Sequence, residues 1–417
     1  MALTVRDLTK LQCFQHLTLV SGKSGLENKV SGMGILDYEL MPEFIDDFLQ
    51  TFTPGDFVLC SFLYQYCTNR PEEILPMVKA LYSYGAAGIG FKAILYPTLP
   101  EEVLNFADEK KFPVFQFGKD TYYENLVYEI TDALQTDDRN LLTSENIDSM
   151  ILGTMPQNRI YTIAKNLSIS FKEWCQVTYV TFYSDVFKRN ISRYFQNFYL
   201  NRNLSNKAMI APYQDGFFII STANRKDEKY FDIILHDVLT YLNIPSEEIR
   251  LRENVLRRSE ENGVAPYKNN NFHKDSLLSC SSQIHKSFES LDQCFKESFH
   301  TYVASLAEGR NFYSYQNLGV YEILVKHYKS TEMEQYMQRY LEPMLGKEDY
   351  MDTAVALVHA GGDIVKAAEI FGCHRNTIRY KLARMHEMIG NAPENENDFF
   401  MNLSLAVRIY LLRQVGK

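Results

Sequence analysis

A short segment near the end of the chain gathers side chains that suit hydrogen bonding to nucleic acid. From His374 to His386 there are four Arg or Lys residues and no acidic residue. Arginine can pair bidentately with guanine and asparagine with adenine, while threonine, tyrosine and lysine suit phosphate oxygens. The residue types therefore predict two sets of contacts with double-stranded DNA. The candidates for bases are His374, Arg375, Asn376 and Arg379, and the candidates for phosphates are Thr377, Tyr380, Lys381 and Arg384.

Two helices are needed to position these side chains. The first is expected over about 364–371, with Asp363 as its N-cap and Gly372 ending it in a left-handed conformation. Its apolar face has helical spacing and consists of Ile364, Ala367, Ala368 and Phe371. The second helix is expected to bury Ile378, Leu382, Met385 and Ile389. Because Ala367 and Ala368 are small, a second helix can cross closely over the first. This arrangement is typical of a helix-turn-helix that enters the major groove.

One position departs from the common helix-turn-helix pattern. Lys381 stands where a β-branched apolar residue is usual, with Leu382 beside it, and we interpret this as a longer recognition helix. The alternative is an ordinary helical hairpin with a solvated charged face. The small residues, the glycine turn and the uninterrupted basic, amide-rich face in one register favour the DNA-reading interpretation.

Length, charge and cysteine usage limit the class of protein. A chain of 417 residues can hold two to four domains, and its net charge of −9 argues against general coating of nucleic acid, so DNA contact should be local and salt-sensitive. The seven cysteines are scattered without a CxxC motif, which indicates a reducing compartment and neither a disulfide framework nor a zinc site. We see no signal peptide and no segment of membrane-spanning length. A cytoplasmic protein without membrane contact is expected.

The first part of the chain alternates between strand and helix patterns. Strands are expected near 57–61, 86–92 and 112–117, and helices near 72–84, 100–111 and 122–134. This alternation predicts an N-terminal α/β domain over 1–135 with parallel strand pairing. The polar stretch 136–148 is expected to be a linker or a connecting helix. Gly22 to Gly25 lacks the spacing of a phosphate-binding loop and is interpreted as a turn.

A second α/β pattern is expected over 149–308. Its elements are a strand at 175–183, helices at 185–200 and 228–242, a hairpin over 207–223, a loop at 267–275 and a helix at 276–308. A helical region over 309–417 follows, with the helix-turn-helix domain at its core (350–412). The predicted fold class is therefore multidomain, α/β plus all-α.

The recognition segment resembles that of a known family. His374 to Leu382 is similar to the His-Arg-Asn-Thr-(Leu/Ile)-Arg-Tyr-Arg-Leu segment of the PucR/CdaR class of bacterial transcriptional regulators, with Lys381 in place of the last Arg. Lysine keeps the charge there but loses the guanidinium fork. Tyr315 to Leu324 and Leu403 to Arg408 resemble segments that flank the family's motif, and Gly22 to Val30 resembles the Gly-x-x-Gly-Leu-x-x-x-Val of its N-terminal domain. The recognition segment also has a weaker likeness to the nucleoid protein Fis.

The resemblance implies a ligand-responsive regulator. It implies a PucR-like N-terminal effector or sensor domain over 1–135, a degenerate GGDEF-like (CdaR-type) domain over 149–308 and the C-terminal DNA reader. A homodimer or higher homo-oligomer would bind operator DNA under control of a small molecule of unknown identity, from purine or ureide catabolism or a similar pathway. No cofactor is expected.

Catalysis is not predicted. The hairpin Tyr213 to Phe217 keeps one acidic residue, whereas a cyclase needs two carboxylates on Mg²⁺. Neither a Gly-x-Ser-x-Gly nor a His-Glu-x-x-His motif occurs, so no catalytic residue and no metal site are assigned. The alternative function is a nucleotide-binding or cyclase-related signalling protein that uses the central domain. A structural nucleoid protein is a third possibility that fits poorly with two large preceding domains.

Overall fold

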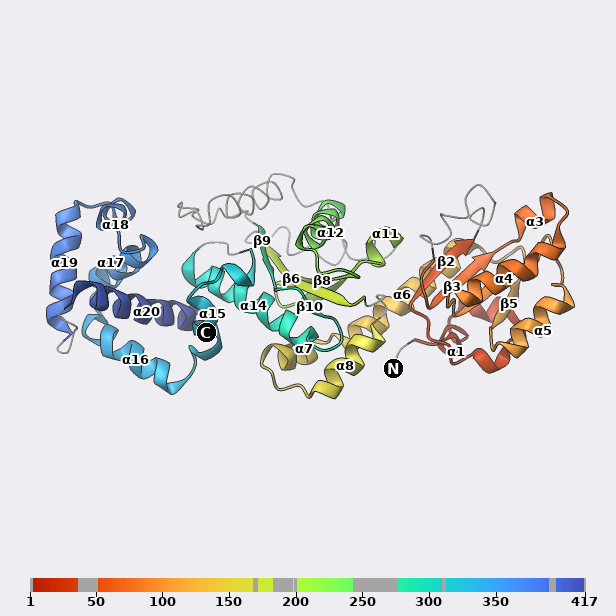
Figure 1. Cartoon of the computed structure of the whole chain (residues 1–417), viewed down its shortest axis with the longest axis horizontal. Helices are drawn as coiled ribbons and strands as arrows, with labels where there is room; N and C mark the ends of the chain where they lie inside the picture. Colours follow the sequence, from red (N-terminus) through yellow and green to blue (C-terminus); the bar gives the residue numbers. More distant parts are fainter. Residues whose placement is uncertain are drawn as a thin grey trace.

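The computed structural model divides into three parts that follow one another along its long axis in chain order (Figure 1). It describes residues 3–36, 52–167, 172–182, 198, 201–242, 277–309, 313–389 and 395–415. Two α/β parts precede a helical C-terminal part, so the predicted fold class is confirmed. The helix expected at 185–200 and the loop expected at 267–275 lie outside the described residues, apart from Phe198, which is helical.

The N-terminal part is built on a five-stranded sheet in the order β1-β5-β4-β3-β2. Neighbouring strands from β2 to β5 pair in parallel, as the alternating pattern predicts, and β1 pairs antiparallel with β5 at the edge. The strands are β1 (Leu17–Ser21), β2 (Gly32–Leu36), β3 (Asp56–Cys60), β4 (Gly88–Lys92) and β5 (Val114–Phe117). The helices of this part are α1 (Val5–Leu8), α3 (Leu63–Cys67), α4 (Ile74–Ser83), α5 (Glu101–Glu109) and α6 (Tyr123–Leu141).

Both faces of this sheet are covered, because alternate residues of a strand point to opposite faces. On β3, Val58 and Cys60 join the core formed with α4 and α5. Phe57 and Leu59 join the other core, formed with α1 and α6. Helix α6 continues past residue 135, so the polar stretch begins as a connecting helix rather than as a loop.

The central part holds a five-stranded antiparallel sheet in the order β10-β6-β8-β7, with β9 also pairing with β6. Its strands are β6 (Trp174–Phe182), β7 (Ala208–Tyr213), β8 (Gly216–Ala223), β9 (Leu277–Ser281) and β10 (His285–Lys286). Helices α7 (Ser144–Ile151), α8 (Gln157–Asn166) and α14 (Leu291–Glu308) pack on one face. The short α11 (Arg202–Ser205) and α12 (Glu228–Tyr241) pack on the other.

The single helix expected over 276–308 is wrong for residues 277–290. Residues Leu277–Ser281 form β9, His285–Lys286 form β10, and the helix begins only at Leu291. All five residues of β9 are buried. A short run buried on both faces has no period of its own, so its sequence does not distinguish strand from helix.

The C-terminal part is a helical bundle that shares helix α14 with the central part. Its helices are α15 (Tyr321–His327), α16 (Thr331–Leu341), α17 (Glu348–His359), α18 (Ile364–Phe371), α19 (Arg375–Met388) and α20 (Glu396–Val415). The first half of α14 packs on the central sheet, and Ala304 and Ala307 at its other end pack with α15 and α20. A single helix thus belongs to both cores (Figure 1).

A buried ion pair strengthens this junction. Glu308, at the end of α14, lies 3.7 Å from the Nε atom of Arg408 on α20, and both side chains are nearly inaccessible to solvent. The hydroxyl of Tyr321 donates to the Glu308 carboxylate at 2.5 Å. The charge of Glu308 is therefore compensated from two elements of the C-terminal part.

Candidate nucleic-acid interface

Helix α18 is bounded by the residues that the sequence predicts. The Asp363 side chain accepts hydrogen bonds from the backbone N–H groups of Val365 and Lys366, at 2.9 and 3.2 Å. Gly372 follows the helix with a φ of 71°, a left-handed conformation that glycine adopts without a steric cost. Both predicted caps are confirmed, and they fix where the turn toward α19 begins.

The two helices of the motif meet through small and apolar residues. Ala367 and Ala368 on α18 are buried with Ile378 of α19 in one cluster that α17 completes. Before α18, Gly362 has a φ of 87°, and a Cβ atom there would stand 2.8 Å from the ring of Phe400 on α20. The glycine therefore allows the chain to turn into α18 against a helix that lies behind it.

Helix α19 begins with an unusual cap. The Nδ1 atom of His374 accepts the backbone N–H of Asn376 at 3.3 Å. Since Nδ1 is occupied as an acceptor, the Nε2 position of this ring is the one directed to other partners. His374 therefore both starts the helix and lies at its exposed N-terminal end, the end that a recognition helix presents to bases.

Seven of the eight candidate residues lie on the exposed surface of α19 or at its N-cap. Tyr380 is 62% exposed, and the side chain of Arg384 is 53% exposed. Arg384 forms an ion pair with Glu387 at 2.5 Å on this surface. The exposed candidates are His374, Arg375, Asn376, Thr377, Arg379, Tyr380 and Arg384.

Lys381 is placed differently from the other candidates. Its side chain is only 10% exposed, and its Nζ atom lies 2.5 Å from the Asp349 carboxylate and 3.2 Å from the Thr353 hydroxyl of α17. The ammonium also lies 4.3 Å from the centre of the Phe371 ring. These contacts hold α19 to α17 and α18. They differ from the expected phosphate contact, because the Lys381 ammonium faces α17 and α18 and not the exposed surface of α19.

Asp349 and Thr353 are the residues that the sequence interpretation missed. They are four apart, on one side of α17, and the Thr353 hydroxyl donates to the backbone carbonyl of Asp349. The signal for their role was Lys381 itself, a lysine at a position that usually packs into the core. A buried lysine requires a compensating carboxylate nearby in space.

The hairpin of the central sheet is connected to its neighbours by hydrogen bonds. Tyr213 is buried, and its hydroxyl donates to Asp148 of α7 at 2.5 Å, while burial raises the pKa of this phenol well above its usual range. The backbone carbonyl of Asp215 accepts from the Thr181 hydroxyl. Within the described ranges, no three His, Cys, Asp or Glu side chains are grouped to hold a metal ion. The same ranges contain no helix that combines the length and hydropathy of a membrane span.

Helices α18 and α19, with the exposed face of α19, form a helix-turn-helix of the kind that presents its second helix to the major groove of DNA. Comparison with known families agrees: residues 350–409 match the PucR C-terminal helix-turn-helix domain, and residues 7–134 match the purine catabolism regulatory protein-like family. The chain is thus similar to these two families over its N-terminal part and over the helices of its C-terminal part.

Two individual proteins were found to be similar. The chain is 24% identical over 115 residues to the purine catabolism regulatory protein of Bacillus subtilis (strain 168), a match that covers 27% of this chain and 20% of that protein. The crystal structure of a regulator of polyketide synthase expression from Bifidobacterium adolescentis aligns with 69% of this chain and 99% of that chain. Its sequence identity is 13% and its TM-score 0.27.

Proposed function

We propose that the protein is a sequence-specific transcriptional regulator of the PucR type whose binding to DNA is controlled by a small metabolite. The observation that carries the proposal is the exposed surface of α19, where seven polar or basic side chains project from a helix held by an apolar core. The curated relative is a purine catabolism regulatory protein, which supports an effector from purine or ureide breakdown or from similar chemistry.

We assign the DNA contacts by residue type and position. His374, Arg375, Asn376 and Arg379 would contact bases, and Thr377, Tyr380 and Arg384 would contact phosphates. Lys381 would instead keep α19 in place through Asp349. A single helix-turn-helix reads few base pairs, so useful affinity requires at least a homodimer on a two-part operator.

The remaining parts would connect the effector to the DNA reader. Residues 1–135 would form the effector domain and 149–308 a degenerate GGDEF-like relay domain, in a cytoplasmic protein that regulates rather than catalyses. The antiparallel β7–β8 hairpin, with its turn at Gln214 and Asp215, supports the GGDEF-like assignment. The C-terminal region, 309–417, would bind the operator. Binding of the effector to one arrangement of the dimer would shift the spacing of the paired recognition helices.

The test is selection of genomic fragments by the purified full chain, followed by sequencing, with and without a metabolite panel. A discrete enriched site near catabolic genes, altered by one metabolite, is the expected result. Uniform or absent enrichment would contradict the proposal. A melting temperature that rises with a nucleotide only when Mg²⁺ is present would favour the alternative, a nucleotide sensor in the central domain.

A further inference from the structure

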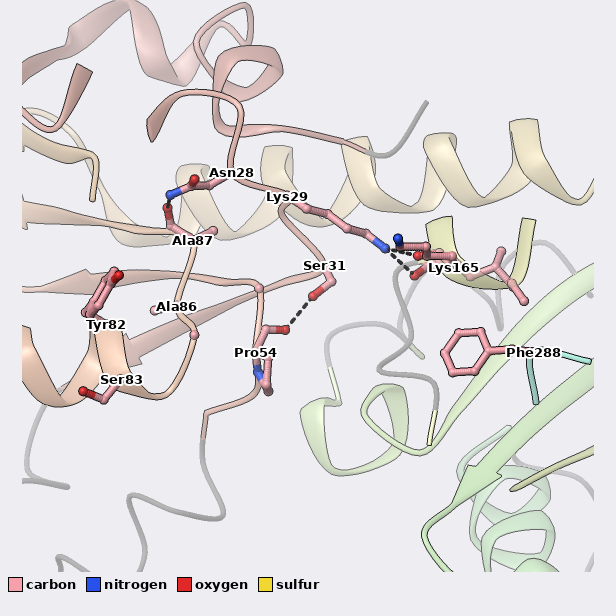
Figure 2. A pocket seen from close by; sticks show the side chains of 14 residues that line it. Asn28, Lys29, Ser31, Pro54, Tyr82, Ser83, Ala86, Ala87, Lys165 and Phe288 are labelled. Atoms are coloured by element: carbon pink, nitrogen blue, oxygen red, sulfur yellow. Dashed lines mark hydrogen bonds between the residues drawn. The ribbon is translucent and has the colours of Figure 1, made fainter. Parts of the chain in front are cut away.

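A cavity of about 770 Å³ lies where the N-terminal part faces helix α8 of the central part. Figure 2 shows Lys29 reaching from the N-terminal part toward Lys165 near the end of α8, with Tyr82 on the first part and Phe288 beside α8. Phe288 belongs to the segment between β10 and α14. The walls of the cavity therefore come from segments that are far apart in the sequence.

The charged groups that line the cavity are of one sign. Lys29 and Lys165 both line it, and no carboxylate side chain is present among its described lining residues. The Nζ atom of Lys29 donates to the backbone carbonyl of Lys165 at 2.5 Å and to that of Leu167 at 3.4 Å. An ammonium has three N–H donors, so one remains for a partner in the cavity.

The Lys29 ammonium is partly buried, with carboxylates on one side of it. Burial lowers the pKa of its ammonium, while the carboxylates of Asp138 and Asp137 on α6 raise it and Lys165 lowers it further. Those carboxylates are not among the lining residues, so an incoming ligand would face the ammonium groups. A half-buried cation gains more from an additional anionic partner than an exposed one, because water screens the interaction less.

The aromatic side chains of the cavity are held by neighbouring rings. The ring of Tyr82 packs edge-on against Phe106 and Phe112, with centroids 5.7 and 5.9 Å apart. The ring of Phe288 lies 5.8 Å from that of Tyr161. Aromatic faces favour flat, unsaturated ligands, because such ligands can stack on them.

We propose that this cavity binds a small organic anion with a flat, unsaturated body, its negative group held by Lys29 and Lys165. This inference extends the proposed function, because it gives the effector a binding site. It rests on the proposed function only in that the bound anion is taken to be the effector that regulates DNA binding. The carbonyls that accept from Lys29 lie at the C-terminal end of α8 (Gln157–Asn166). A bound anion would compete with them for the ammonium and so change how the two parts are joined.

The experiment compares two pairs of probes that differ in charge but hardly in shape. Benzoate and nicotinate are titrated into the full-length protein against benzamide and nicotinamide, and binding is followed by ligand-observed NMR. Each anion is expected to bind at least about tenfold more tightly than its amide. K29Q and K165Q should each weaken binding of the anions by about tenfold or more, and K29R should retain most of it.

The controls separate this site from general charge and from the proposed function. K23Q removes an exposed lysine of the same domain outside the cavity and should leave anion binding unchanged. Equal affinity for anions and amides, binding indifferent to K29Q and K165Q, or no binding by any probe would overturn the site. Operator binding measured on the same samples distinguishes the two proposals: its absence beside intact anion binding would remove only the proposed function.

Discussion

Loss of the Arg375 side chain should have the most direct effect on the affinity and base preference of DNA binding. It is exposed in the first turn of α19, where side chains reach base edges in the major groove. We expect Arg375→Ala to weaken operator binding by about 1–3 kcal/mol and to relax preference at one base pair. The measurement is fluorescence anisotropy on the selected operator and its single-base variants.

The matched control for this variant is Arg339→Ala. Arg339 is an exposed arginine in the last turn of α16, so its removal changes the net charge equally without touching α19. An Arg375→Ala protein with the parent's affinity and base preference would exclude this residue from the reader.

Lys381 should behave as a structural residue and not as a phosphate contact. Its replacement by methionine keeps the length of the side chain and removes the cost of burying an ammonium in a site that is already enclosed. Its ion-pair partner, Asp349, has a side chain 64% exposed, so water can solvate the carboxylate that is left. Because the remaining carboxylate is open to water, we expect Lys381→Met to change the free energy of unfolding by no more than about 1 kcal/mol, as for exposed ion pairs.

The salt dependence of DNA binding distinguishes the structural role of Lys381 from a phosphate contact by Arg384. Lys381→Met should leave the slope of log K against log salt unchanged, whereas Arg384→Gln should reduce it by about 0.9, the value for one phosphate contact. A slope that falls by the same amount in Lys381→Met would mean that the ammonium leaves Asp349 and reaches the DNA.

At this scale the sequence predicts which side chains of α19 are exposed, except where a distant partner decides. Exposure of Arg375, Asn376 and Arg379 follows from helical period and from the buried stripe on the other side of α19. The position of Lys381 was recognisable as unusual, but its partner Asp349 is 32 residues earlier in the chain. Nothing in local spacing indicates which carboxylate a buried lysine will meet.

At the scale of elements, Gly362 before α18 and Gly372 after it should differ in how well they tolerate a side chain. Both have a left-handed φ, but a Cβ at Gly362 would meet the Phe400 ring at 2.8 Å, while a Cβ at Gly372 meets nothing described within 4 Å. We expect Gly372→Ala to cost about 1 kcal/mol from backbone strain alone, and Gly362→Ala to cost more. Denaturant unfolding of both variants measures the difference, and an equal cost would refute the close approach to Phe400.

Elements with a clear period were predictable, and those defined by long-range pairing were not. Strands β3, β4 and β5 and helix α18 have local signals, namely apolar runs between turns for the strands and caps at both ends for the helix, whereas β1 and β2 were not predicted. Strand β9 has none, because its identity depends on pairing with β6 about 100 residues earlier in the chain. The two-sided burial that makes it a strand also removes the alternation by which a strand is recognised.

At the scale of the whole molecule, the Glu308–Arg408 pair should control how the central and C-terminal parts unfold together. Glu308→Ala leaves the Arg408 guanidinium nearly buried without its carboxylate, which costs about 3–5 kcal/mol in comparable sites. Glu334→Ala is the matched control. Glu334 pairs at 2.8 Å with Arg413, which lies on α20 like Arg408, but the side chain of Glu334 is 43% exposed. That variant should lose about 1 kcal/mol or less.

The chain offers a convenient way to observe this coupling. Its single tryptophan, Trp174, lies on β6, so tryptophan fluorescence reports the central sheet while circular dichroism at the helical band reports all parts. The two probes should give one transition for the parent protein and separate transitions for Glu308→Ala. Coincident transitions in that variant would mean that the pair does not couple the two parts.

The sharing of α14 between two cores also limits how this protein can be taken apart and recombined. A fragment that starts after Glu308 would leave behind the helix against which α15 and α20 pack, and would expose the apolar side chains of that seam. A hybrid regulator that borrows this DNA reader therefore has to inherit α14 from Leu291 onward, together with the sheet face on which it rests. Exchange of parts among such proteins would preserve the central and C-terminal parts as a pair, and leave the N-terminal part as the one that can be replaced.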